Sequence, residues 1–151
     1  MIKMIRLLAL ALVMLTVFNS CKKDQLEVDE KLIKEFIAKN NIPALRHESG
    51  LYYQIILPGS GSGIDVNSLV TFNYTGRLLS GVVFEGPTTS PITYQLGSLI
   101  KGWKIGMPLI RKGGRIRLII PSELAYGRDG QGKIKPNTVL DFDIELVNVQ
   151  N

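Results

Sequence analysis

The sequence predicts an α+β fold in which an antiparallel β-sheet closes over one short α-helix. Segments that alternate apolar and polar residues recur along the chain, and Gly, Pro or Ser turn signals separate them every ~8–12 residues. Only one short stretch between these segments has helical spacing. The 151 residues, 45% of them hydrophobic and 21% charged, fit one globular domain rather than a disordered chain.

The amino terminus predicts a secretory signal. Basic residues precede the apolar run Leu7–Phe18, which is shorter than the ~20 residues that span a bilayer. Cys21, the only cysteine, directly follows Ser20, and this arrangement resembles a bacterial lipoprotein signal. We therefore expect residues 1–20 to be a cleaved signal peptide and Cys21 to carry a lipid. The chain would then be a lipid-anchored membrane protein of the bacterial cell envelope, periplasmic or in the outer membrane. An ordinary cleaved signal and an uncleaved anchor are the alternatives.

A linker and helical arm are expected over residues 21–44, before a compact domain over residues 45–151. Apolar residues of the arm fall on one face of a helix, at Leu32, Ile33, Phe36 and Ile37. Asp24 and Glu27 have the spacing of a capping box at its start, and the segment Asn40–Pro43 ends it. This helix is expected to pack on the domain or to offer a dimerisation or partner surface.

Six strands are expected in the domain, each bounded by turn residues. They are Leu51–Leu57, Leu69–Leu79, Val82–Phe84, Pro91–Leu96, Arg115–Ile120 and Leu140–Leu146. The short helix is expected at Leu99–Met107, ended by Pro108, and a single turn at Ser122–Tyr126 leads into the Gly-rich loop Gly127–Pro136. The stretch Pro58–Gly63 is also rich in glycine, but it lacks the Gly-Lys-Ser/Thr of a phosphate loop and is interpreted as a turn.

The composition provides few side chains that could take part in covalent chemistry or bind a metal ion. One Cys and one His exclude a four-ligand zinc site and a disulfide framework. His47 is interpreted as a surface residue, and the acidic residues of the last strand as groups on its solvent face: Asp141, Asp143 and Glu145. Without the two cations of the signal, the net charge falls from +5 to about +3, so no nucleic-acid partner is expected. Arg115 and Arg117 alternate with apolar residues, as on the wet face of a strand.

A series of short motifs says more about the function than the composition does. They follow one another as Tyr74-Thr75-Gly76, Gly81–Glu85, Tyr94–Gly97, Leu99–Trp103, Gly113-Gly114, Ile119–Pro121, Ala125–Gly127, Pro136–Leu140 and Phe142–Leu146. Each motif alone is weak evidence, whereas the whole ordered series, which includes the only Trp, is specific. In order and spacing it resembles the FKBP-type peptidyl-prolyl cis-trans isomerases over roughly Leu51–Val149.

The resemblance implies an antiparallel half-barrel wrapped around the short helix, with an apolar pocket between them and no cofactor. The residues that it marks as catalytic are Tyr74, Phe84, Glu85, Trp103, Tyr126 and Phe142. Those that it marks as substrate-binding are Leu99, Ile100, Ile92 and Ile134. By the same resemblance, Trp103 would form the pocket floor, and the Ile100 N–H and Tyr126 hydroxyl would hold carbonyls of the bound peptide. Phe72 and Tyr52 have no counterpart role and are expected to be core residues.

Three positions depart from the family pattern. Glu85 stands where Asp is usual, and Ile92 stands where an aromatic residue is common. The loop Arg128–Lys135 is one residue shorter than in the best-known eukaryotic members, and Gln131 is near a position often aromatic or His. Because this loop would overhang the pocket, substrate preference and affinity for macrolides are expected to differ.

The resemblance implies an enzyme that isomerises X-Pro bonds in exported proteins, by desolvation and transition-state binding in an aromatic pocket. Its partners would be proline-containing polypeptides and FK506-like macrolides. The alternative is a non-catalytic proline-peptide-binding chaperone on the same fold. A carbohydrate- or small-ligand-binding lipoprotein is a third interpretation, but it would need exposed aromatic residues on strand faces, which this sequence offers in small number.

Overall fold

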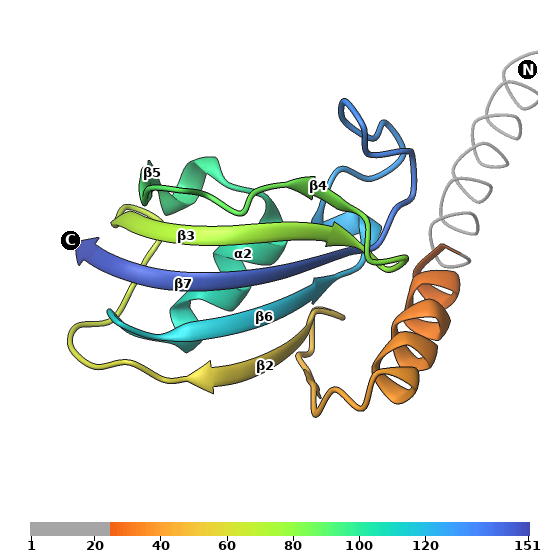
Figure 1. The fold of residues 1–151 in the computed structure, drawn as a ribbon, viewed down its shortest axis with the longest axis horizontal. Coiled ribbons are helices and arrows are strands. Elements are labelled where there is room, and N and C mark those ends of the chain that lie inside the picture. The colour runs from red at the N-terminus through yellow and green to blue at the C-terminus, as the bar shows by residue number, and fades with distance from the viewer. Residues whose placement is uncertain (1–24) are drawn as a thin grey trace, which may run out of the picture.

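The computed structural model describes residues 25–151, which form a curved sheet, a short helix on its inner face and a second helix at one end (Figure 1). The expected signal peptide, Cys21 and Asp24 lie outside the described residues. Among residues 25–151, no helix is both long enough and apolar enough to cross a membrane.

Seven strands of the described chain pair into one antiparallel sheet. They are β1 (Leu45–Arg46), β2 (Tyr52–Leu57), β3 (Leu69–Leu78), β4 (Val83–Glu85), β5 (Ile92–Gln95), β6 (Arg115–Ile120) and β7 (Leu140–Gln150). The order across the sheet is β1-β2-β6-β7-β3-β4, and β5 also pairs with β3. The longest pairing joins β3 and β7, from Leu69 opposite Gln150 to Leu78 opposite Leu140. This pairing fixes which residues of both strands face inward, because side chains alternate between the two faces of a sheet.

The inner helix α2 (Lys101–Gly106) lies directly on β6. A Cβ atom at Gly102 would be 2.5 Å from Ile120 Cγ2, and one at Gly106 would be 2.5 Å from Leu118 Cδ2. A larger residue at either position would therefore force the buried Ile120 or Leu118 side chain to move. The 3₁₀ turns η1 (Leu96–Ser98) and η2 (Met107–Leu109) flank the helix, and their buried side chains complete the core between helix and sheet.

The predicted antiparallel sheet over one short helix is confirmed, and the predicted strand Arg115–Ile120 coincides with β6. The helix predicted at Leu99–Met107 is wrong in its ends, because α2 covers only Lys101–Gly106. Pro108 does not end it but lies within η2, at a helix start where a proline lacks no needed N–H. The last strand continues past Leu146 to Gln150 because β3 offers partners down to its first residue. The two-residue strand β1 was not predicted.

A helix at residues 25–39, the arm helix, packs on the outer face of the sheet. Its Ile33 is fully buried in a cluster that also contains Ile42, Tyr52, Ile119 and Val139. The helix ends where the sequence predicts: the Asn40 side-chain amide donates to the Phe36 carbonyl at 2.8 Å, and Asn41 has a φ of 52°. Of the two alternatives for the arm, the structure shows the helix packed on the domain, and Tyr52 is a core residue as expected.

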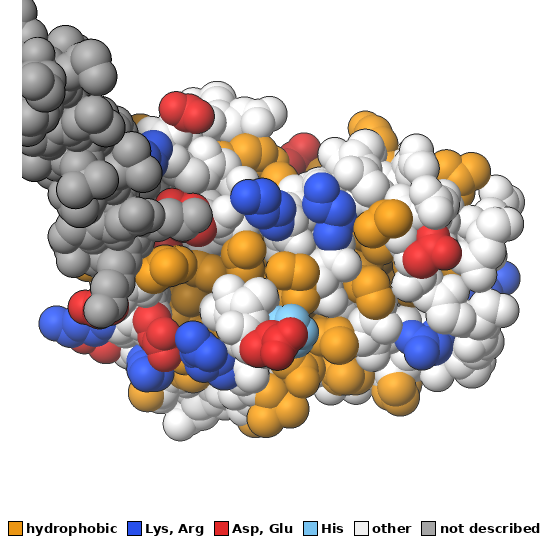
Figure 2. Space-filling view, turned by 180° about the vertical axis from the view of Figure 1, so that it is seen from behind, with side chains coloured by type: hydrophobic (Ala, Val, Ile, Leu, Met, Phe, Trp, Pro, Cys, Tyr) orange, Lys and Arg blue, Asp and Glu red, His pale blue; other side chains and the backbone are white. Residues whose placement is uncertain are grey.

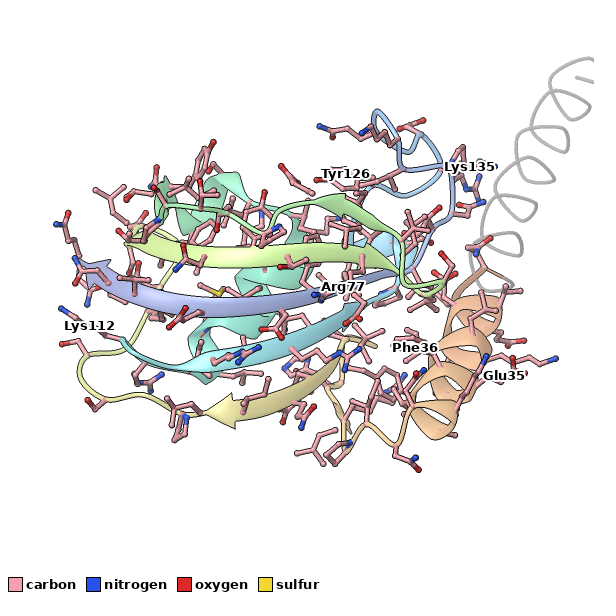
Figure 3. The ribbon with its side chains drawn as sticks, in the orientation of Figure 1. Glu35, Phe36, Arg77, Lys112, Tyr126 and Lys135 are labelled. Atoms are coloured by element: carbon pink, nitrogen blue, oxygen red, sulfur yellow. The ribbon has the colours of Figure 1, made fainter. Side chains whose placement is uncertain are left out.

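Two arginine–aspartate pairs cross the outer face between β6 and β7. Arg117 donates two hydrogen bonds to Asp141, at 2.8 and 2.7 Å, and Arg115 donates two to Asp143, both at 2.8 Å. The interpretation of Asp141 as a solvated group is wrong, because this residue is only 2% exposed. The arm helix reaches the Arg117 pair, with the Phe36 ring 5.6 Å from the Arg117 guanidinium carbon, whereas Glu35 points away from the sheet (Figure 3).

Asp141→Asn is expected to lower the free energy of unfolding by about 2–4 kcal/mol, because it leaves the half-buried Arg117 without a counter-charge. The matched control is Asp143→Asn, which breaks a pair of the same geometry in which the Arg115 side chain is 52% exposed and the Asp143 side chain 26%. Water screens that pair, so the expected loss is under about 1 kcal/mol. Urea denaturation of both variants checks the difference, and equal losses would contradict it.

Candidate functional site

A cavity of about 370 Å³ lies between the inner face of the sheet and the start of α2. Strands β3, β4, β5 and β7, the residues that open α2 and the segment after β6 all contribute to its lining. Most of the predicted site residues border it: Tyr74, Glu85, Ile92, Leu99, Ile100, Trp103, Tyr126 and Phe142. The fold thus brings together side chains that are spread over nearly seventy residues of sequence.

Trp103 is the aromatic residue of α2 and is only 4% exposed. The rings of Phe72, Tyr74 and Phe142 surround its indole, with centroids at 4.8, 5.4 and 5.4 Å and interplanar angles of 63°, 86° and 84°. Edge-to-face contacts of this kind are favourable and hold the rings in fixed orientations. None of the three rings stacks in parallel on the indole.

Tyr74 and Glu85 form a polar pair at the cavity. The Tyr74 phenol donates a hydrogen bond to the Glu85 carboxylate, so this longer acid still reaches the tyrosine. Burial first, and this hydrogen bond second, raise the pKa of Tyr74 well above its usual value. Burial, followed by the charge of Glu85, also raises the pKa of Tyr126. Both phenols therefore keep their protons at neutral pH and can donate hydrogen bonds.

Two donors at the cavity have no partner within residues 25–151. Ile100 precedes α2, and its carbonyl accepts from the Trp103 and Lys104 N–H groups at 3.0 and 3.2 Å, but its own N–H donates to no group of the described chain. The Tyr126 hydroxyl likewise forms no hydrogen bond to another described residue. Because both residues border the cavity, a ligand with two carbonyl groups could satisfy both donors.

The loop after Tyr126 reaches the cavity through Gln131. The backbones of Gln131 and Ile134 exchange hydrogen bonds of 2.9 and 2.8 Å, which folds the loop into a tight turn. Figure 3 shows Tyr126 at the foot of this projecting loop, with Lys135 on its outer side. A loop closed in this way holds Gln131 at the cavity border, where a side chain can contact a bound ligand.

Phe84 and Ile134, although predicted as site residues, are not part of the lining. Phe84 packs edge-on against Phe142 at 5.6 Å, where Gly76 leaves room for both rings. Ile134 is 8% exposed and belongs to the core. Phe84 therefore supports the cavity wall from behind, through its contact with Phe142.

The structure adds two residues to the lining that were not predicted there, Phe72 and Tyr94, and it places Gln131 there as well, on the loop that was expected to overhang the pocket. Phe72 is 1% exposed, so it is a core residue as expected, yet it also borders the cavity. Tyr94 stacks on Phe72 with centroids 6.4 Å apart. Its place two residues after Ile92 on β5 was the missed signal, since residues i and i+2 of a strand share a face.

Groups for covalent or metal chemistry do not gather in the described chain. His47 lies in the turn before β2, with its Nδ1 2.9 Å from the Ser49 hydroxyl. The single histidine is visible at the surface, among mixed charged and hydrophobic side chains (Figure 2). Within residues 25–151, no group of three or more His, Cys, Asp or Glu residues could hold a metal ion. The site offers an aromatic surface and hydrogen-bond donors, which suit a ligand that is apolar and contains amides.

Comparison with known proteins points to one family. A family model described as FKBP-type peptidyl-prolyl cis-trans isomerase matches residues 62–147. The isomerase FkpA of Escherichia coli is 39% identical over 126 residues, which are 82% of this chain and 44% of FkpA. A probable isomerase of this type from Haemophilus influenzae is 38% identical over 134 residues, 87% of this chain and 55% of that protein. The chain thus spans about half the length of these curated relatives.

Solved structures show the same similarity. The crystal structure of Escherichia coli FkpA aligns with a TM-score of 0.75 at 35% identity, over 85% of this chain and 62% of that one. A peptidyl-prolyl cis-trans isomerase from Pseudomonas syringae aligns with a TM-score of 0.74 at 33% identity, over 85% and 96% of the two chains.

The buried Tyr74 predicts a pH dependence of stability. Because the folded pKa is raised, the unfolded chain loses this proton first, at about pH 10. The stabilisation is therefore complete below about pH 10 and is lost as the pH rises toward the folded pKa. Urea denaturation between about pH 8 and pH 11 should show a steeper fall in the wild-type chain than in Tyr74→Phe. Parallel curves would contradict the assignment to Tyr74.

Proposed function

From the premise that the chain belongs to the FKBP-type peptidyl-prolyl cis-trans isomerase family, we propose that it accelerates rotation about X-Pro bonds in exported proteins. The observation that carries this proposal is the cavity itself. Two donors that have no partner among residues 25–151, the Ile100 N–H and the Tyr126 hydroxyl, border a space whose other lining residues are mostly aromatic or aliphatic.

The reaction needs no nucleophile. Rotation about a peptide bond faces a barrier of ~18–20 kcal/mol because the C–N bond has partial double-bond character. An X-Pro bond populates both isomers, and their uncatalysed exchange takes roughly tens to hundreds of seconds. The planar amide separates charge and is favoured by water, whereas the twisted transition state has lost this resonance. A site that removes water therefore favours the transition state over the ground state, and such differential binding is catalysis.

Each part of the cavity has a proposed role in that process. The proline ring would lie against Trp103, among the rings of Tyr74 and Phe142, with Leu99 and Ile92 at the border. The Ile100 N–H and Tyr126 hydroxyl would hold carbonyls on either side of the rotating bond. Glu85 would act through Tyr74, whose hydroxyl it orients.

The same cavity supports proposals about ligands. Its volume of about 370 Å³ lies within the ~300–1,000 Å³ typical of small-molecule sites, which is consistent with FK506-like macrolides as ligands. Ile92 and Gln131 on its border differ from the common family residues, and we attribute a distinct substrate preference to them.

Lipid anchoring is also part of the proposal. Residues 1–20 would be removed as a signal peptide, Cys21 would carry the lipid, and residues 21–44 would join the anchor to an isomerase domain of residues 45–151. The basis is the sequence alone: an apolar run too short to span a bilayer, and a single cysteine that directly follows Ser20 shortly after that run. The isomerase would then work at a membrane of the bacterial cell envelope.

A second candidate function is a proline-peptide-binding chaperone without catalysis. Glu85 and Ile92 favour it, because both replace residues usual in the family at the cavity itself. Binding and catalysis can be separated by experiment, since a pure binder would hold X-Pro peptides without changing their exchange rate.

Catalysis is tested by prolyl exchange on a short X-Pro peptide in a protease-free assay. Trp103→Ala should lower kcat/KM by more than about tenfold, because it removes the surface that excludes water. Tyr126→Phe should lower kcat/KM by about two- to tenfold, the equivalent of one lost hydrogen bond. Tyr53→Phe, which removes a hydroxyl outside the cavity, is the matched control and should leave the rate unchanged. Circular dichroism verifies that each variant is folded.

Acceleration that survives Trp103→Ala would contradict the proposed site. A folded wild-type chain that binds the peptide without accelerating exchange would instead support the chaperone alternative.

Anchoring is tested by labelling bacterial cells with radioactive palmitate. The wild-type chain should take up label and Cys21→Ser should not, because the thiol is the attachment point. Ser20→Ala keeps a small residue before the cysteine and should still be labelled. Label retained on Cys21→Ser would rule out the anchor.

A further inference from the structure

A buried carboxylate joins the arm helix to the domain. Asp29 and Ser122 are both fully buried, although 93 positions separate them in the sequence. One Asp29 oxygen accepts the Ser122 N–H at 2.8 Å and its hydroxyl at 2.6 Å, and the other accepts from the Gln25 side-chain amide at 2.7 Å. A carboxylate inside a protein is costly unless donors surround it, and here three donors do so.

The other side of Ser122 holds the segment that carries Tyr126. The Ser122 carbonyl accepts the N–H groups of Ala125 and Gly127, at 2.9 and 2.8 Å. Tyr126 therefore lies between Ala125 and Gly127, whose N–H groups both donate hydrogen bonds to the Ser122 carbonyl. The Gly127 carbonyl in turn accepts the Asn137 N–H at 2.7 Å, which closes the base of the loop. Asp29 is thus the far end of a chain of hydrogen bonds that reaches both neighbours of Tyr126.

We propose that Asp29 is a positioning residue, which fixes Ser122 and thereby holds the Tyr126 hydroxyl in place at the cavity. This inference rests on the proposed function, because it gives the arm helix a part in the isomerase site. Figure 1 shows the arm helix and the loop of residues 127–136 at the same end of the sheet, as this role requires.

Docking of the arm alone does not account for the carboxylate. Ile33 and the apolar cluster around it already bury one face of the arm helix. An apolar side chain at residue 29 would add to that burial without the cost of enclosing a charge. The carboxylate instead fixes the orientation of Ser122, because its charge-assisted hydrogen bonds hold both the backbone and the side chain of that residue.

The test compares Asp29→Asn with Ile33→Ala in the whole 151-residue chain, at a temperature where both are folded. Ile33→Ala opens a cavity in the same docking face but removes no hydrogen bond to Ser122, so it controls for lost stability. Asp29→Asn should lower kcat/KM by about tenfold and speed amide exchange at Gly127, since small displacements in a site are costly. Ile33→Ala should leave both within about twofold of the wild-type values. Equal effects in the two variants would overturn the inference.

A second comparison tests whether Asp29 acts through Tyr126. In the Tyr126→Phe background no hydroxyl remains to be positioned, so adding Asp29→Asn should change kcat/KM by less than about twofold. Independent sites would instead give multiplied losses, and that result would overturn the inference. If Asp29→Asn does not fold, Ser122→Ala replaces it, because it removes the hydroxyl donor and leaves the backbone bond.

Amide exchange separates this inference from the proposed function. Absence of isomerase activity in the wild-type chain would contradict the proposed function. Amide exchange at Gly127 would still report whether Asp29 holds the segment Ser122–Gly127 in place. Normal activity with Gly127 exchange unchanged by Asp29→Asn would leave the isomerase intact and remove the role of Asp29.

Discussion

The pairing of β7 with both β6 and β3 is the constraint on which the rest of the structure depends. Phe142 lies opposite Leu118 on one side and Gly76 on the other, and this register turns Phe142 and Ile144 toward α2. Asp141 and Asp143 consequently face outward, where the arginines of β6 meet them. One register thus builds the cavity on the inner face and the docking surface of the arm on the outer face, because a shift by one residue would exchange the two faces.

The inner face favours binding by exclusion of water rather than by covalent chemistry. Trp103 and the rings around it enclose an apolar space, and the donors of Ile100 and Tyr126 stand at its border. Such a site discriminates between a planar, well-solvated amide and a twisted, less polar one, and this difference is what an isomerase must exploit. Activity would then be sensitive to small movements of Tyr126, which links the site to the segment after β6 and, through Ser122, to the arm helix.

Local patterns in the sequence predicted much of the fold, because alternation of apolar and polar residues is a direct consequence of strand geometry. Strand β6 shows this best, since the prediction matched both of its ends. Such local patterns cannot predict contacts between segments that are far apart in the sequence. Asp141 was interpreted as solvated because its partner Arg117 lies 24 positions away on β6. The hydrogen bonds between Asp29 and Ser122 join residues 93 positions apart, so no local pattern predicts them. Most cavity residues were predicted from the ordered family motifs, whereas Tyr94 was missed although it shares a strand face with the predicted Ile92.

The central claim is that an X-Pro segment binds against Trp103, and the single tryptophan of the chain gives a direct reporter of it. The measurement is a nuclear magnetic resonance titration that follows the indole N–H signal of the whole chain with a short X-Pro peptide. A matched peptide with Ala in place of Pro is the control. The account predicts a saturable shift of the Trp103 signal with the proline peptide and little change with the control. An unmoved signal at saturating proline peptide, or equal shifts with both peptides, would contradict it.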